Sequence, residues 1–362
     1  MEKSLTLFFK IGSILTITPA YSKNTTRFQK FYTYVLVVFI TVAATVSVKN
    51  RDYPSYCIYA KIAVNLLTDA NLIICTSTLA LAVVVWRKDD WQKLMENLKT
   101  MISLGNKNKL ERNIKIHLIT LFVDFVMIVL IYIYWSAAYH GFMKYVTSYL
   151  VQYCQSYILY CYTTFVGFIL NVIKSHYVYL NTILQQEVMK PNNCSKRMFL
   201  TLTKTERTMY YLKDTADNFN NATGWSTALL ISYTSLYILN NFDYIYQVSV
   251  NHEIGMGFHI IAEGFSVFLL FVRTSTVIIK CDLILHEAEK ILDNSYILRR
   301  NCYGLSDSEK NRLKEFSESV LQNLPKFSAA RFFNINRSTI LSMLATDITF
   351  LIIMIQFHGS AQ

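Results

Sequence analysis

The sequence predicts an all-α membrane protein, a bundle of seven transmembrane helices with a cytosolic N-terminus and an extracellular C-terminus. Of its 362 residues, 53% are hydrophobic and only 16% are charged, which is too apolar for an ordinary soluble domain. The apolar residues form long uncharged runs, and a helix needs about 20 such residues to cross the hydrocarbon layer. Four prolines and ten glycines suit long helices with short connections.

Seven runs are long and apolar enough to be transmembrane spans. In chain order, the predicted spans are residues 31–48, 62–86, 116–139, 145–173, 219–240, 254–279 and 338–357.

The basic residues predict the orientation of these spans, because cytosolic loops retain positive charge during insertion. Of the 35 Lys and Arg residues, thirty lie in segments 1–30, 87–115, 174–218 and 280–337, which all fall on one side of the membrane. Four lie on the opposite side and one, Arg273, lies inside span six. We therefore place the N-terminus in the cytosol, and the net charge of +11 is a topology signal that does not indicate nucleic-acid binding.

Two of the cytosolic segments carry helical patterns of their own. Apolar residues in 174–218 continue the period of span four, so this span is expected to project into the cytosol as a helical extension. Ser306 and Glu309 form a capping box, which predicts that a helix begins there. That helix has one apolar face, formed by Leu313, Phe316, Val320 and Leu324, and Pro325 limits its length.

The chain therefore divides by topology. The predicted parts are the N-terminal segment 1–30, spans one to four in 31–173, the helical extension 174–218, spans five and six in 219–279, cytosolic helices in 280–337, span seven in 338–357 and an extracellular tail, 358–362.

Ionisable residues inside spans are costly and usually mark a function or a pair. Asp124 and Arg273 lie at similar depths, at about 1.5 Å per residue from the cytosolic ends of spans three and six. They predict a structural ion pair, with snorkelling of Arg273 to the interface as the alternative. Asp69, Glu263 and Asp347 have no cationic partner at matching depth, so we expect them to face a water-filled cavity or pore, or to be protonated.

Span four carries an aromatic stripe about 120° wide, made of Tyr145, Tyr149, Tyr153, Tyr157 and Tyr160. Packing is the alternative interpretation of such a stripe. Phenols offer a stacking face and a hydroxyl group, and polar and aromatic residues lie at similar depth on spans two, three and six. The predicted small-molecule pocket consists of Asn65, Asp69, Tyr132, Trp135, Tyr149, Tyr153, Tyr157, His259 and Glu263.

The C-terminal run resembles a signature of insect gustatory receptors. Thr349-Phe350, five apolar residues and then Gln356-Phe357 are similar to the Thr-Tyr-(five hydrophobic)-Gln-Phe motif of that family's last helix, with Phe350 in place of Tyr. Further similar elements are Phe8 to Pro19 before the first span, His286-Glu287-Ala288 after the sixth, and Phe327 with Phe333-Asn334-Ile335-Asn336-Arg337 before the last.

This resemblance implies a homo- or heterotetrameric channel for monovalent and divalent cations in the plasma membrane of chemosensory neurons. Span seven would line the pore, residues 280–337 would form a cytosolic anchor, and a small-molecule tastant would bind in the outer half of the bundle. Ile353, Gln356 and Phe357 share a helix face and would form the gate; the alternative is that they mark the interface end of a buried helix. An aromatic pocket favours a bitter plant compound over a sugar.

The sequence shows no paired acid–base geometry and no nucleophile or metal-ligand spacing, so we expect no catalysis, no cofactor and no metal. The partners expected are the tastant, permeating cations, family subunits and membrane lipid, without nucleic acid. A secondary transporter, a membrane enzyme with intramembrane carboxylates and an odorant-receptor-type channel subunit remain as alternatives.

Overall fold

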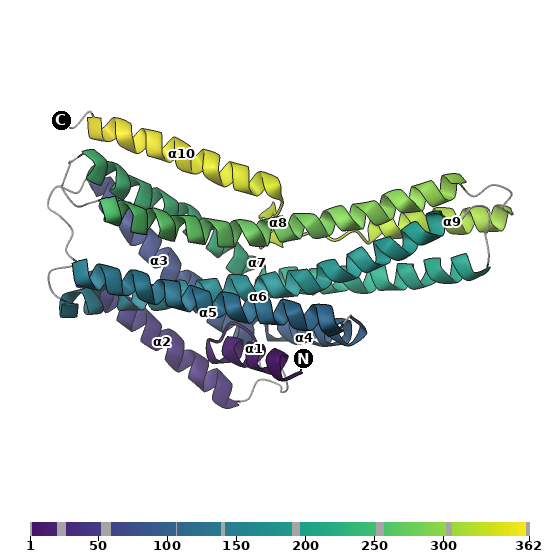
Figure 1. Ribbon diagram of the computed structural model, residues 1–362, viewed down its shortest axis with the longest axis horizontal. Coiled ribbons are helices and arrows are strands. Elements are labelled where there is room, and N and C mark those ends of the chain that lie inside the picture. The colour runs from purple at the N-terminus through teal and green to yellow at the C-terminus, as the bar shows by residue number, and fades with distance from the viewer. Residues whose placement is uncertain are drawn as a thin grey trace.

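In a computed structural model the protein is almost entirely helical, which confirms the predicted all-α fold (Figure 1). The structure describes residues 2–19, 27–51, 59–105, 107–138, 142–189, 196–250, 257–301 and 306–359. The α-helices within these ranges are α1 (Glu2–Ile14), α2 (Arg27–Lys49), α3 (Tyr59–Leu81), α4 (Lys88–Leu104), α5 (Lys107–Ala138), α6 (Phe142–Val188), α7 (Lys196–Val250), α8 (Gly257–Asn301), α9 (Asp307–Gln322) and α10 (Arg337–Gly359). A π-helical turn, η1 (Ala82–Trp86), joins α3 to α4, and two short strands, β1 (Ser328–Ala329) and β2 (Phe333–Asn334), precede α10.

Four segments of the described chain are long and apolar enough to cross a membrane: Arg27–Lys49, Ile62–Trp86, Asn108–Ala137 and Phe142–Val188. They cover predicted spans one, two and four and residues 116–137 of predicted span three. Predicted spans five and seven lie within α7 and α10, and residues 257–279 of predicted span six belong to α8. Large apolar side chains such as Phe39 on α2 and Phe122 on α5 are each 68% exposed, which suits contact with lipid better than contact with water.

Three helices run without interruption from the membrane-type bundle into a second, smaller bundle that contains α9 (Figure 1). α6 has 47 residues, α7 has 55 and α8 has 45. Beyond predicted span four, α6 continues to Val188 with Tyr177 and Leu184 fully buried, whereas residues 196–218 of the predicted extension belong to α7. Because one rigid element enters both bundles in each case, the two are linked by continuous helix.

The predicted start of α9 is confirmed in detail. The Ser306 hydroxyl accepts a hydrogen bond from the backbone N–H of Glu309, and the Glu309 carboxylate accepts one from the backbone N–H of Ser306 at 2.9 Å. The helix ends at Gln322, three residues before Pro325. Its apolar face, with Leu313, Phe316 and Val320, is buried.

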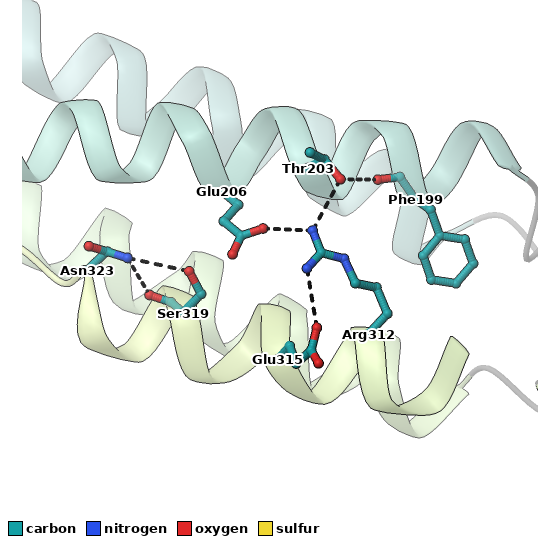
Figure 2. A network of polar contacts seen from close by, with 7 residues as sticks. All are labelled: Phe199, Thr203, Glu206, Arg312, Glu315, Ser319 and Asn323. Carbon is teal, nitrogen blue, oxygen red and sulfur yellow. Dashed lines mark hydrogen bonds and ion pairs between the residues drawn. The ribbon is translucent and has the colours of Figure 1, made fainter. Parts of the chain in front are cut away.

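A polar network holds α9 against α7 (Figure 2). The Arg312 guanidinium forms an ion pair with Glu206 of α7 at 3.0 Å and reaches the Thr203 hydroxyl at 3.4 Å. The same guanidinium contacts Glu315 one turn along α9 at 3.4 Å. These contacts join α9 to α7 beside the buried apolar face of α9.

α1 and α4 pack as helices that the sequence analysis did not predict. Phe8 and Phe9 of α1 are fully buried, and the Phe8 ring centroid lies 4.1 Å from that of Phe165 on α6. On α4, Trp91 and Leu98 are buried in the same core. Both helices therefore cover the part of α5, α6 and α7 where the two bundles meet.

A hairpin of two two-residue strands, joined by the three-residue loop 330–332, connects α9 to α10. Ser328 pairs with Asn334 and Ala329 with Phe333, and Ala330 and Arg331 adopt positive φ values of 51° and 65° in the turn between them. The hairpin lies directly on α7, because a Cβ on Gly224 would come within 2.9 Å of the Ala330 nitrogen.

The first residue of α10 is also tied to its neighbour. The Arg337 side chain pairs with Asp282 of α8 at 2.7 Å. Together with the hairpin, this ion pair sets where α10 starts and the direction in which it leaves.

Candidate ligand site and pore helix

Four tyrosines of α5 and α6 form one aromatic group, which we call the tyrosine cluster: Tyr132, Tyr145, Tyr149 and Tyr153. The hydroxyl groups of Tyr145 and Tyr153 are hydrogen-bonded at 2.9 Å. The Tyr132 ring centroid is 5.6 Å from the centroids of both, and the Tyr149 centroid is 5.0 Å from that of Tyr145. These spacings are those of interacting aromatic pairs, so the stripe on α6 makes contacts across to α5.

Other residues predicted for the pocket contact aromatic residues outside this cluster. Glu263 of α8 is half-buried. Tyr157 packs on Phe125, with ring centroids 5.6 Å apart. Trp135 packs on Tyr134 at 5.7 Å.

For two further residues predicted for the pocket, Asn65 and His259, the structure gives the helix on which each lies. Asn65 is half-buried on α3, one turn before Asp69. The side chain of His259 lies outside the described residues, although its backbone belongs to α8.

The expectation that Asp69 lacks a cationic partner was wrong. Arg51, just beyond the end of α2, places Nη1 2.6 Å from the Asp69 carboxylate. Its other nitrogens donate to the Ser148 carbonyl at 3.2 Å and to the Gln152 side chain at 3.2 Å. The guanidinium also lies over the Tyr149 ring, 4.9 Å from its centroid.

Arg51 thus joins α2, α3 and α6, and it borders the tyrosine cluster. Arg51 was not predicted as a site residue, because it lies in the connection after predicted span one. Its signal was a basic residue within one turn of a span end, from which a long side chain can reach back along the neighbouring helices.

The structure brings Asp124 of α5 and Arg273 of α8 together as an ion pair. The Asp124 side chain is 1% exposed and that of Arg273 is 23% exposed. The second carboxylate oxygen of Asp124 is buried without a hydrogen-bond partner among the described residues. The ion pair therefore links α5 to α8, and the aspartate is its more deeply buried member.

Asp347 of α10 faces the neighbouring helix α7 and not a cavity or pore, whereas the alternative expectation, that its carboxyl group is protonated, stays a prediction. It is 5% exposed and accepts a hydrogen bond from the Ser235 hydroxyl at 2.6 Å. Met343, one turn earlier, is buried on the same side. These residues mark the side by which α10 is attached to its own chain.

The opposite side of α10 is uncovered. Gln356 lies nine residues after Asp347, half a turn away around the helix at about 100° per residue, and it is exposed. Ser342 and Thr349 share that uncovered side, and Ile353 on its flank is 39% exposed. The Phe357 side chain lies outside the described residues.

Of the family-like motif, Thr349 and Phe350 are also exposed. The uncovered side of α10 thus combines large apolar groups with a few hydroxyl and amide groups.

Comparison with known proteins shows the family to which the chain belongs. The sequence model of the 7tm chemosensory receptor family matches residues 3–359. A candidate gustatory receptor, 39b, from Drosophila melanogaster is 26% identical over 360 residues, covering 91% of this chain and 92% of the relative.

Solved structures show the same fold. The chain superposes on the insect olfactory receptor OR5 from Machilis hrabei with a TM-score of 0.64 and 12% identity, covering 98% of each chain. On the structure of that receptor in complex with eugenol the TM-score is 0.67 with 11% identity, covering 98% of this chain and 99% of that one.

The bundle of long membrane-type helices, with its helical extension, is thus that of a seven-helix chemosensory receptor. The chain belongs to the 7tm chemosensory receptor family, and it is a membrane receptor rather than an enzyme. The family resemblance predicted from residues 349–357 is confirmed.

Proposed function

We propose that the chain is a gustatory receptor that acts as a tastant-gated, non-selective cation channel. In this proposal the N-terminus is cytosolic, the C-terminus is extracellular, and four subunits in the plasma membrane of chemosensory neurons surround one pore. α10 of each subunit lines the pore, and the second bundle forms the anchor that joins the subunits. The ligand binds at the tyrosine cluster.

The observation that carries the proposal is the one-sided attachment of α10. The uncovered side of α10 carries Ser342, Thr349 and Gln356 among apolar residues. Such a mixed surface suits contact with water better than contact with lipid alone, because transferring polar side chains into hydrocarbon is costly. Four copies around an axis would turn that side toward water and ions. Ring-like arrays of a few polar atoms on an apolar wall permit conduction, and apolar constrictions gate by dewetting.

The ligand class is supported by the aromatic character of the site. The related olfactory receptor OR5 was solved with eugenol, a small molecule, and the tyrosine cluster offers ring faces to a ligand of similar size. Sugars require many hydrogen-bonding groups, whereas the Tyr145 and Tyr153 hydroxyls already bond to each other. A bitter plant compound is therefore favoured over a sugar.

An odorant-receptor-type channel subunit is the second candidate, because the superposed structures are olfactory receptors. The relative found by sequence is a candidate gustatory receptor, and the Gln356-Phe357 pair in α10 is similar to the end of the gustatory receptor motif. Both favour taste.

Recording from cells that express the full chain tests the channel. Gln356→Ala should change single-channel conductance or ion selectivity while leaving ligand potency nearly unchanged. Gln185→Ala, at an exposed glutamine of α6 in the second bundle, is the matched control and should change neither. Unaltered permeation in Gln356→Ala, or an N-terminal epitope tag accessible on intact cells, would overturn the proposal.

A further inference from the structure

We propose that the hairpin before α10 binds an anionic phospholipid of the cytosolic leaflet through Arg331, Phe332 and the neighbouring Trp225 of α7. We call these three residues the tip surface. The inference rests on the proposed function for its orientation, because only a cytosolic hairpin meets that leaflet. It depends on three features of the structure: an exposed aromatic pair, a fixed hairpin that presents it, and basic side chains without acidic partners.

The aromatic pair lies open on the surface of the chain. Phe332 is 70% exposed and Trp225 is 49% exposed, and their rings meet edge to face with centroids 5.3 Å apart. Trp225 is the seventh residue of predicted span five, about 9 Å from its cytosolic end at 1.5 Å per residue. Trp side chains are enriched at this depth, where the headgroups meet the acyl chains.

The hairpin lies at the same level as this end of span five. Arg337, at the start of α10, directly precedes predicted span seven, and its partner Asp282 lies three residues beyond the end of predicted span six. Figure 1 shows α10 beginning near the middle of α8, where the two bundles meet. In the proposed orientation, the hairpin therefore lies at the cytosolic surface of the membrane.

The backbone of the hairpin is fixed and strained. The backbone N–H of Ser328 donates to the side chain of Asn220 on α7 at 3.2 Å. Ala330 and Arg331 have φ values of 51° and 65°, a region that residues other than glycine rarely adopt. Glycine would fit both positions with less strain, yet position 331 carries a long, exposed cationic side chain. Strained residues of this kind cluster at binding sites.

The charge of this segment favours an anionic lipid. Lys326 and Arg331 are exposed, and within the part of the chain that the structure describes neither forms an ion pair. Residues 319–346 contain Lys326, Arg331 and Arg337 and no Asp or Glu. The cytosolic leaflet is anionic and attracts basic residues beside spans, and a guanidinium group binds phosphate oxygens in a bidentate manner. The tip surface thus combines a group that binds phosphate with rings that contact acyl chains.

A second copy of the chain fits this surface less well than a lipid does. At their exposed fractions the two rings offer roughly 250 Å² of contact area, whereas each partner in a stable protein interface buries about 800 Å². The tip surface therefore suits a small partner, such as a single lipid molecule.

Two lipids of equal chain length test the inference on the purified full-length chain in detergent. Dioctanoyl phosphatidylserine carries a net negative charge and dioctanoyl phosphatidylcholine does not, and their affinities are measured from the lipid-dependent thermal shift. Each basic residue at an anionic surface contributes about fivefold in affinity, so two unpaired ones should make phosphatidylserine bind at least about tenfold more tightly. Inorganic phosphate, which lacks acyl chains, should give no shift. Equal affinities for the two lipids, or binding of phosphate as tight as that of phosphatidylserine, would overturn the inference.

Variants assign the effect to the tip surface. Arg331→Gln should reduce the preference for phosphatidylserine by about fivefold. Arg331→Gly should do the same without loss of stability in the absence of lipid, because glycine suits the positive φ. Arg300→Gln, at an exposed position near the end of α8, is the matched control and should change neither affinity. A preference for phosphatidylserine that persists in both Arg331 variants would refute the role of Arg331.

The aromatic pair has its own variant. Phe332→Ser should weaken the binding of both lipids, because it removes a ring that contacts acyl chains. Light scattering of the same purified variant reports the number of subunits in each particle. If that number changes while both lipid affinities stay the same, the tip surface is a contact between copies of the chain and the inference is wrong.

Recordings separate this inference from the proposed function. If tastants open the channel and phosphatidylserine binds no better than phosphatidylcholine, the lipid site is wrong and the channel function stands. If phosphatidylserine binds through Arg331 and no tastant evokes a current, the channel function fails and the lipid site stands.

Discussion

The Asp124–Arg273 pair predicts an asymmetric effect of mutation. Arg273→Met would leave the Asp124 carboxylate, 1% exposed, without a cation, and breaking a buried pair in this way costs about 3–5 kcal/mol. Asp124→Asn would leave a guanidinium that is 23% exposed and can extend toward the interface, with an expected cost of about 1–2 kcal/mol. The double variant leaves no buried charge, so it should be more stable than the sum of the two effects indicates, by about 2 kcal/mol.

Unfolding of the purified protein in lipid nanodiscs measures these free energies. Lys314→Met, which breaks an exposed pair with Glu318 on α9 at 3.8 Å, is the control and should change stability by less than about 0.5 kcal/mol. The reasoning is refuted if the two single effects simply add in the double variant, or if Asp124→Asn is as costly as Arg273→Met.

Two further predictions concern the hairpin and α9. Gly224→Ala should lower the unfolding temperature, because the new Cβ would lie 2.9 Å from the hairpin backbone at Ala330. The control is Gly264→Ala on α8, where nothing lies within 4 Å of the added Cβ; this change should be neutral or stabilising by about 0.5–1 kcal/mol. Equal effects of the two substitutions would contradict the close approach of the hairpin to α7. Arg312→Met should cost only about 1 kcal/mol, because the network in Figure 2 is partly exposed, and a cost above about 3 kcal/mol in the same unfolding assay would show that α9 depends on it far more than we infer.

The positions of the long helices, and the depth of charged residues along them, were the features that the sequence predicted best. Uncharged runs predicted where long helices lie, and the Ser306–Glu309 capping box predicted the start of α9. Counting residues from the span ends placed Asp124 and Arg273 at similar depths, and the two are in contact. These inferences succeed because rise per residue and capping are local properties of a helix.

Features that depend on side-chain reach or very short elements were not predicted. Asp69 was assigned no partner, since only residues inside spans were considered, whereas the long Arg51 side chain reaches it from beyond α2. The strands at Ser328 and Phe333 have two residues each, too few for any periodicity. α4 did carry a signal, because Trp91, Leu94 and Leu98 share one face of a helix.

The continuity of α8 has a mechanical consequence. At about 1.5 Å per residue its 45 residues form a stiff rod of roughly 70 Å, with Glu263 near one end and the Asp282–Arg337 ion pair, which ties it to α10, near the middle. A tilt of about 5° around its midpoint would displace each tip by roughly 3 Å. Because the two tips move by equal amounts in opposite directions, a displacement of the end that carries Glu263 would be accompanied by an equal one in the second bundle, whereas the Asp282–Arg337 pair near the midpoint would move little.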